Sequence, residues 1–472
     1  MLNRPRLIAV LLFTALQLSA AADQITLTID PAQRFQTIQG FGACLYLGAS
    51  HPYDQDWYQT LYARDLGCSI VRMELTPWVL GKDITLPVRL GDDIEADIRL
   101  MDFSAAGGRN AATFIRAINQ KKLDRLLLIG SLWTPPHWMK DGAVIHYGNN
   151  SGGGHLKMDA DNLEQFARYV SAYVKGFERV CGVPFYAVSL QNELMFKEPY
   201  NSCQYTPQEY HDAVAAVGRA FARYGIITKI MGPEGMAPNG DFFTGKQMGW
   251  IDAVQTDPET AGFLGFFCGH GHGDGEDDFR QYWSKIAGFG KESWVTEWAG
   301  EFPDWIHFDN QGKPDGALAM AWHLHEMLAD GNNSAALYWQ CSDGGPKLTD
   351  QNLTGNAPES ANASTKFAVA RNFFRWIRPG AVRVAITPES PELGASAYVH
   401  EKPRTLTIEL VNTSDHGHAI RIQLLAEAPP KAFKAFRSTA TERCAAQPDL
   451  IPTGGVINFT LPAEAVMTLY GQ

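Results

Sequence analysis

The sequence predicts an α/β fold, a parallel (β/α)8 TIM barrel, followed by a C-terminal β-sandwich side domain. From about Ile38 onward, short apolar runs alternate with helical stretches, and eight such runs can be counted. After Pro379-Gly380 the pattern changes to alternating apolar and polar residues separated by turn signals. A chain of 472 residues is also too long for one compact core, which favours a barrel beside a smaller domain.

The eight predicted barrel strands are rich in β-branched and aromatic residues, and helices are expected between them. The strands are predicted at Gly40–Tyr46, Ser69–Leu75, Arg125–Leu132, Phe185–Gln191, Lys229–Gly232, Phe263–Gly269, Ser293–Thr296 and Ala335–Gln340. The clearest helices are predicted at Asn162–Val180, Pro207–Tyr224, Pro314–Asp330 and Thr365–Ile377. In the second of these, Thr206 is a suitable N-cap and Pro207 a suitable first-turn residue.

The predicted sandwich has about 90 residues and short strands with period-two patterning. Its strands are predicted at Val382–Ile386, Ala395–His400, Leu406–Val411, Ala419–Leu424 and Val456–Leu461, with Leu461–Leu469 as a further candidate. The early run Ile25–Ile29 alternates too and is expected to join the sandwich. The predicted division is a signal peptide at 1–22, a joining strand at 23–37, the barrel at 38–378 and the sandwich at 379–472.

The first two dozen residues have the three parts of a secretory signal peptide. Arg4 and Arg6 provide a basic start, an apolar run too short to span a bilayer follows, and small residues precede Asp23. We therefore expect a secreted or periplasmic protein, with a buried N-terminal helix as the alternative. No later segment is apolar for long enough to span a membrane, so no membrane span is expected.

Charge and composition narrow the range of partners. The formal net charge is −11 and positive residues form no runs, which argues against a nucleic-acid or anionic-membrane partner. Aromatic residues make up 11% of the chain, including 12 Trp, and their flat faces can stack on sugar rings or pack in the core. The seven cysteines are scattered, which argues against a zinc ribbon or a redox motif. We expect a polysaccharide or oligosaccharide substrate, a monomer, and no cofactor.

Catalytic residues on a barrel of this kind lie at the C-terminal ends of its strands. Glu193 follows the predicted fourth strand directly after Asn192, and Glu297 follows the predicted seventh. Strands four and seven lie across the barrel mouth, so these two carboxyl groups can face one another over a cleft. Glycosidic bond cleavage needs such a pair, one carboxylic acid to protonate the leaving oxygen and one carboxylate to attack the anomeric carbon.

Four stretches carry a resemblance to a known family. These are Gln39-Gly40-Phe41-Gly42-Ala43, Trp133-Thr134-Pro135-Pro136-His137-Trp138-Met139-Lys140, Gln191-Asn192-Glu193 and Arg378-Pro379-Gly380-Ala381-Val382-Arg383. In this order they resemble motifs of glycoside hydrolase family 30, a family of (β/α)8 retaining enzymes with a side sandwich. The resemblance covers nearly all of the chain beyond residue 22.

The resemblance implies roles for individual residues. Glu193 resembles the family's acid/base and Glu297 its nucleophile, while Asn192 resembles the residue that bonds the sugar 2-hydroxyl. Arg72 resembles an arginine that supports the nucleophile electrostatically, with a structural ion pair as the alternative. Trp133 and Trp339 resemble walls of the subsite for the attacked sugar, with core packing as the alternative.

The chain departs from the family pattern in two places. Leu194 stands where the family has Pro after the acid/base. His270 and His272 occupy the sixth-strand segment, and His272 stands where the family has a Tyr that positions the nucleophile, which would add a pH dependence. These two histidines with Asp274 also suit a metal ion, but hydrolysis by two carboxyl groups needs none, and we expect no metal.

The segment Lys197–Tyr205 is similar to the xylan-cleaving branch of the family, so β-1,4-xylan is the expected substrate. The loop after the eighth strand, Gln340–Pro346, lacks the Arg with which that branch binds glucuronate, which favours unbranched xylan or another β-glycan. The loops Lys82–Gly107 and His146–Lys157 are expected to shape the cleft.

The alternatives to a xylan-cleaving enzyme are a β-1,6-glucanase, or a β-glucosidase or glucosylceramidase, of the same family. Outside this class of enzyme, the alternatives are a carbohydrate-binding protein without activity and an adhesion protein.

Overall fold

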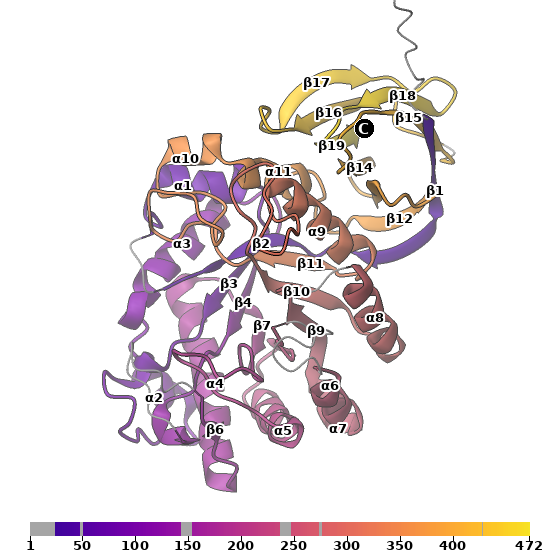
Figure 1. Cartoon of the computed structure of the whole chain (residues 1–472). Helices are drawn as coiled ribbons and strands as arrows, with labels where there is room; N and C mark the ends of the chain where they lie inside the picture. Colours follow the sequence, from indigo (N-terminus) through magenta and orange to yellow (C-terminus); the bar gives the residue numbers. More distant parts are fainter. Residues whose placement is uncertain (1–23, 48–50, 143–152, 237–246, 273–275, 427) are drawn as a thin grey trace, which may run out of the picture.

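The computed structural model describes residues 24–47, 51–142, 153–236, 247–272, 276–426 and 428–472, and it has two parts, a closed barrel and a side sheet (Figure 1). The predicted signal peptide lies outside these residues, as does part of the loop 146–157. Within the described ranges no helix is both long enough and apolar enough to cross a membrane.

The barrel confirms the fold class and all eight predicted strands. The strands are β2 (Gly40–Leu45), β3 (Ile70–Glu74), β4 (Leu127–Ser131), β7 (Phe185–Ser189), β8 (Lys229–Met231), β9 (Leu264–His270), β10 (Ser293–Trp298) and β11 (Ala335–Tyr338). They close in the order β10-β11-β2-β3-β4-β7-β8-β9, and every neighbouring pair is parallel. The seventh strand is two residues longer than predicted and therefore contains Glu297 itself.

Alternating side chains of these strands fill the centre of the barrel. Ile129 belongs to the inner cluster, whereas its neighbour Leu128 faces the surrounding helices. Phe266 and Trp294 stack inside the barrel with ring centroids 4.3 Å apart. The interior of the barrel is therefore a packed core, and a ligand site is expected above it, at the C-terminal ends of the strands.

The helices surround the barrel, and the four predicted ones are present. They are α1 (Asp56–Thr60), α2 (Ile94–Arg99), α3 (Gly108–Lys121), α4 (Ala160–Cys181), α5 (Pro207–Arg223), α6 (Gln247–Gln255), α7 (Pro258–Phe263), α8 (Glu276–Ile286), α9 (Ala317–Ala329), α10 (Pro358–Ala363) and α11 (Thr365–Phe374). Thr206 and Glu209 form a capping box at the start of α5. Helix α9 begins three residues later than predicted, because Pro314 pairs with Phe308 and the Asp315 N–H donates to His307.

The side domain is one nine-stranded sheet that folds back on itself. Its strands are β1 (Gln24–Thr37), β12 (Val382–Thr387), β13 (Leu393–His400), β14 (Thr405–Asn412), β15 (His418–Leu424), β16 (Phe433–Ser438), β17 (Ala445–Leu450), β18 (Val456–Leu461) and β19 (Ala465–Gly471). Their order is β17-β16-β19-β14-β13-β12-β1-β15-β18, and strands near both ends contribute to one apolar core. Strand β1 pairs with both β12 and β15, so the N-terminal strand joins this sheet as predicted.

Two strands of this sheet were missing from the sequence prediction, and a third has shifted bounds. Strand β17 contains Pro448, a residue that weakens a strand prediction but is tolerated here because β17 is at the edge of the sheet. Strand β16 was also missed. The candidate strand Leu461–Leu469 begins only at Ala465, after a turn at Pro462 in which Glu464 has a φ of 48°.

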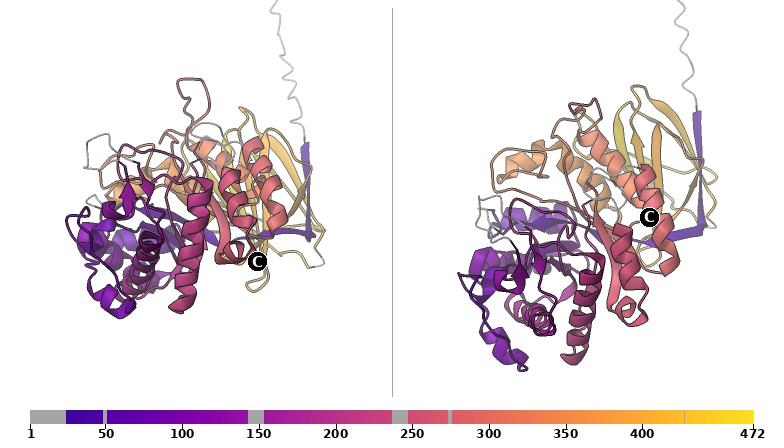
Figure 2. Two further views of the ribbon diagram at one scale, coloured as in Figure 1. Left: turned by 90° about the horizontal axis from the view of Figure 1, so that it is seen from below. Right: turned by 60° about the horizontal axis from the view of Figure 1, so that its bottom comes forward.

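The other face of the side sheet packs on the barrel, as Figure 2 shows from two directions. Tyr398, Val411 and Val466 of the sheet belong to the same core as the barrel helices. Asn372 of α11 donates to the Thr468 hydroxyl at 2.8 Å. These contacts hold α11 against the side sheet. All seven cysteines are buried and unpaired.

Candidate active site

A cavity of about 910 Å³ lies at the C-terminal ends of the barrel strands. All eight barrel strands or the loops that follow them supply its walls. The lining residues are Leu45, Tyr46, Glu74, Trp133, Asn192, Glu193, Tyr200, Asn201, Met236, His272, Glu297, Gln311, Lys313, Trp339, Gln340 and Gln351. The cavity therefore occupies the position where barrel enzymes carry their active sites.

Glu193 lies in the turn that follows β7, the fourth barrel strand. Its φ is 46°, in the left-handed region that a residue with a side chain rarely adopts. The turn is closed by the Phe196 N–H, which donates to the Glu193 carbonyl oxygen at 2.8 Å. Strained backbone of this kind is concentrated at functional sites, where it aims a side chain.

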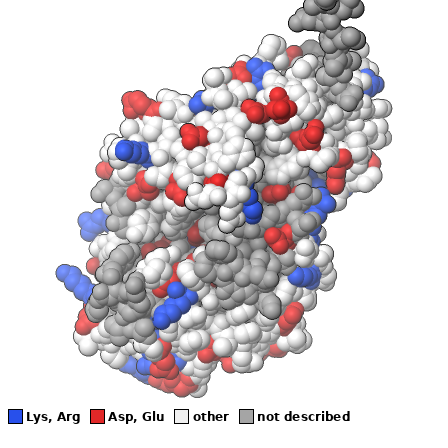
Figure 3. Space-filling model, in the orientation of Figure 1, with Lys and Arg blue, Asp and Glu red and all other residues white. Residues whose placement is uncertain are grey.

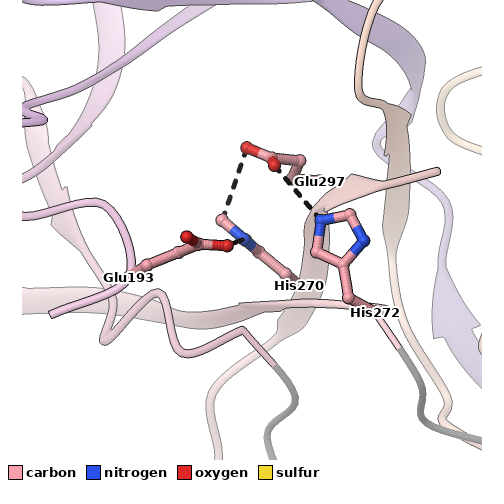
Figure 4. Close-up of side chains that lie close together, drawn as sticks. All are labelled: Glu193, His270, His272 and Glu297. Atoms are coloured by element: carbon pink, nitrogen blue, oxygen red, sulfur yellow. Dashed lines mark hydrogen bonds and ion pairs between the residues drawn. The ribbon is translucent and has the colours of Figure 1, made fainter. Parts of the chain in front are cut away.

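Glu297 lies on β10, on the opposite side of the cavity from Glu193. Its pairing with β9 is irregular, because the register shifts between Val295 and Glu297. Figure 4 shows His270 between the carboxylates of Glu297 and Glu193, and one oxygen of each carboxylate lies within 4.8 Å of the other. Both side chains are buried, at 4% and 7% exposure for Glu193 and Glu297.

Arg72, from β3, forms the floor of the site and is completely buried. Its Nη1 donates to Glu297 Oε2 at 2.6 Å, and its Nη2 donates to Asn192 Oδ1 at 2.5 Å. Its Nε lies 3.3 Å from Oε1 of Glu234, which is itself completely buried. The guanidinium also lies 4.8 Å from the centre of the Trp133 ring. One cation thus holds Glu297, Asn192 and Trp133 in fixed positions.

Two histidines contact the carboxylates, and one of them, His270, lies near both. His270 Nδ1 lies 3.1 Å from Glu193 Oε1, while its Nε2 lies 3.8 Å from Glu297 Oε2. His272 Nε2 lies 3.2 Å from the other oxygen of Glu297 (Figure 4). His272 is therefore a hydrogen-bond partner of Glu297.

The surroundings of the three carboxyl groups at the site shift their pKa values in different directions. Burial favours the neutral form of Glu297, but the charges of His270 and Arg72 and the hydrogen bond from His272 hold its pKa well below the usual value. Burial also opposes ionisation of Glu193, and the hydrogen bond and charge of His270 lower its pKa. Burial and the charge of Glu193 raise the pKa of Glu198 well above its usual value, and Glu198 hydrogen-bonds Glu193. The Glu193–Glu198 pair therefore holds a proton beside an ionised Glu297.

We expect Arg72→Met to lower the free energy of unfolding by about 3–5 kcal/mol, because it leaves Glu234 buried without its counter-ion. Urea unfolding at neutral pH measures this change. Arg89→Ala is the control: Arg89 pairs with Asp161, but their side chains are 58% and 61% exposed, so a loss below about 1 kcal/mol is expected. Equal losses in the two variants would contradict the structural role of Arg72.

His272 gives the folded protein a pH dependence whose direction can be derived. Burial would lower the pKa of His272, but its hydrogen bond to Glu297 and the nearby carboxylate charges raise it. Protonated His272 therefore stabilises the fold fully below its unfolded pKa of about 6.5, and this stabilisation is lost as pH rises through the raised pKa. We expect the difference in unfolding free energy between wild type and His272→Asn to be larger at about pH 5 than at about pH 9. Parallel stability curves would contradict this by showing that the pKa of His272 is the same in the folded and unfolded states.

All eight residues predicted from the sequence lie at this site. Trp133 and Trp339 are half-buried, with ring centroids 6.1 Å apart, and both line the cavity. Glu234, Glu198 and Glu74 were not predicted. Glu234 follows the fifth barrel strand, β8, so the rule that pointed to Glu193 and Glu297 also applied to it. The same rule applied to Glu74, the last residue of β3, whereas Glu198 has no comparable signal in the sequence.

Donor atoms of Glu193, His270, His272 and Glu297 lie within 4.8 Å of one another, a spacing compatible with a metal ion. The guanidinium of Arg72 lies 2.6 Å from Glu297, however, so a divalent cation would meet a fixed positive charge. Asp274, which the metal interpretation included, lies outside the described residues. On the face shown in Figure 3, Lys and Arg are scattered among Asp and Glu without forming a basic patch.

The chain is similar to known proteins in sequence and in fold. No family model matches the chain. The chain is 24% identical over 296 residues to the glucuronoxylanase XynC of Bacillus subtilis, a match that covers 62% of this chain and 61% of that enzyme. It is 28% identical over 225 residues to an endo-1,6-β-D-glucanase of Neurospora crassa, covering 43% of this chain and 44% of that enzyme. The chain thus spans less than two thirds of the length of either relative.

A solved structure shows the same fold over nearly the whole chain. The family 30 endoxylanase of Clostridium papyrosolvens superposes with a TM-score of 0.72 at 22% identity, over 95% of this chain and 100% of that one. Together with the sequence relatives, this likeness confirms the resemblance to glycoside hydrolase family 30 that the motifs predict.

Proposed function

We propose that the protein is a retaining glycoside hydrolase that cleaves β-1,4-xylan through two carboxyl groups. The observation that carries the proposal is the approach of Glu193 and Glu297 across the cavity, with one oxygen of each within 4.8 Å of the other. In retaining enzymes the two carboxyl groups lie about 5–5.5 Å apart, whereas inverting enzymes separate them by about 6.5–9.5 Å to admit a water molecule.

In the first step, Glu193 gives the proton that it shares with Glu198 to the glycosidic oxygen, while the Glu297 carboxylate attacks the anomeric carbon. The bond between that carbon and the leaving oxygen breaks, and an ester to Glu297 forms. Arg72 and His272 each hold one oxygen of Glu297, which keeps it ionised and oriented for attack. Glu198 hydrogen-bonds Glu193 and is the second proton carrier of this pair.

In the second step, the ionised Glu193 takes a proton from water, and the resulting hydroxide attacks the anomeric carbon and releases Glu297. Two displacements at the same carbon retain its configuration. Asn192 lines the cavity and is held by Arg72 and by its own donation to Glu198 Oε1 at 3.1 Å. From this position its amide can hydrogen-bond the 2-hydroxyl of the attacked sugar, and Trp133 and Trp339 would form the walls around that sugar.

The relatives are a glucuronoxylanase and an endo-1,6-β-D-glucanase, so both xylan and β-1,6-glucan are candidate substrates. We choose xylan because of the segment Lys197–Tyr205, which supplies Tyr200 and Asn201 to the cavity. In the loop after β11, both oxygens of Asp343 accept hydrogen bonds from their own loop, from Gly345 N and Thr349 Oγ1. Among the described residues that line the cavity, Lys313 is the one Lys or Arg. We propose unbranched xylan as the preferred substrate.

Release of reducing ends from unbranched xylan, glucuronoxylan, β-1,6-glucan, β-1,4-glucan and aryl β-glycosides tests the proposal. Activity that is highest on unbranched xylan, with an initial product of retained configuration in the NMR spectrum, is the expected result. An inverted product would overturn the mechanism, and preference for β-1,6-glucan would support the second candidate function. Binding of xylooligosaccharide without release of reducing ends would indicate a carbohydrate-binding protein instead.

We also propose that the protein is exported. Arg4 and Arg6, the apolar run after them and the small residues before Asp23 support this proposal. Sequencing the N-terminus of protein recovered from outside the cytoplasm would give Asp23 as the first residue, whereas retention of Met1 would contradict it.

A further inference from the structure

A second cavity of about 770 Å³ lies beside the catalytic one. Tyr46 and Glu74 line both cavities, so the two form one continuous depression across the ends of β2 and β3. The outer part is formed by the segment after β3 and by residues 102–107. The catalytic mechanism uses nothing in this second cavity.

Glu74 stands at the boundary between the two cavities, as the last residue of β3. Its carboxyl group has no hydrogen bond and no ion pair with any other residue that the structure describes, and burial raises its pKa to about 7. A partly buried carboxyl group without a partner is costly unless a ligand supplies donors. Sugar hydroxyl groups are such donors.

Trp78 provides an aromatic face in the second cavity. It lies on the short 3-10 turn Pro77–Leu80 and is only partly buried. Within the described ranges its ring stacks on no other aromatic ring and its indole N–H has no acceptor. Lys82, Asp102 and Ser104 line the same cavity. A free indole face with polar groups around it suits the flat CH face and the hydroxyl rim of a pyranose ring.

We infer that the second cavity is a sugar-binding subsite for a further unit of the same glycan chain that is cleaved in the first. The sugar ring stacks on Trp78, and one of its hydroxyl groups or that of the preceding unit donates to Glu74. This inference rests on the proposed glycosidase function. A chain that occupies both cavities gains binding energy with length, so longer oligosaccharides are better substrates than short ones.

The dependence of kcat/KM on oligosaccharide length tests this inference. The ratio of kcat/KM for a five-unit xylooligosaccharide to that for a two-unit one is measured in wild type, Trp78→Ala, Trp78→Phe and Glu74→Gln. We expect Trp78→Ala to lower the ratio about tenfold, equivalent to about 1.4 kcal/mol, and Trp78→Phe to retain most of it. Trp57→Ala, which removes a partly buried tryptophan outside both cavities, should leave the ratio unchanged.

Calorimetric binding of the same oligosaccharides to Glu297→Gln, with and without Trp78→Ala, gives a readout without turnover. Weaker binding of the long oligosaccharide alone is the expected result. Equal losses for long and short oligosaccharides, or no loss for either, would overturn the subsite. Wild type that cleaves none of the glycans would instead overturn the proposed function.

Discussion

We expect Glu297→Gln to lower kcat/KM on every cleaved glycan by a factor on the order of 10⁴ or more, because a neutral amide cannot form the covalent intermediate. Gln has the same size as Glu, and Arg72 keeps its second carboxylate partner Glu234. The variant should therefore fold. Initial rates of reducing-end release, with thermal unfolding of the same samples, measure the effect separately from any loss of folded protein.

A second readout follows from the pair between Glu297 and His272. Since Glu297 is the main cause of the raised pKa of His272, the pKa of that imidazole should fall in Glu297→Gln, which its NMR titration detects. The control is Glu259→Gln, which neutralises an exposed carboxylate on α7 that pairs with Arg219. This control should leave both readouts unchanged. Activity that survives in Glu297→Gln would show that another group attacks the sugar.

Much of the fold could be predicted because each barrel strand carries its own local signal. An apolar run of strand length between two helices is recognisable without knowledge of its neighbours. Eight such runs that alternate with helices favour one arrangement, a closed parallel barrel. The positions of Glu193 and Glu297 follow from the same logic, since the ends of parallel strands meet at one rim. The edge strand β17 was missed because its sequence, with Pro448, is tolerated only where no neighbour needs the N–H group.

The parts of the site that escaped prediction depend on contacts between distant segments. Glu198 follows Glu193 by only five residues, and nothing in the sequence indicates that it folds back to hydrogen-bond both Asn192 and Glu193. Glu234 follows a strand end, but its role depends on the ion pair with Arg72, which lies on a strand 162 positions earlier in the chain. Burial, which sets the proton affinities of these carboxyl groups, is a property of the assembled barrel.

We expect Glu193→Gln to lower kcat/KM for xylan by about 10²–10⁴-fold, the usual contribution of a general acid and base. The size of the loss should depend on the leaving group. An alkoxide leaves slowly without a proton, whereas a nitrophenolate needs little assistance, so the loss in the first step should be much smaller with nitrophenyl glycosides. The rates of release of nitrophenol and of xylooligosaccharide by the same enzyme sample give this comparison directly.

The second step of the same variant offers the sharper test. Without Glu193 no base activates water, so the ester to Glu297 should accumulate and appear as a burst of nitrophenol followed by slow turnover. Azide needs no base, so with Glu193→Ala, which leaves room for the anion, it should restore turnover and give a glycosyl azide of retained configuration. Neither the burst nor the rescue should occur in Glu297→Gln, because that variant forms no ester. Rescue in the Glu297 variant alone, with an azide product of inverted configuration, would mean that the roles of the two carboxyl groups are not as proposed.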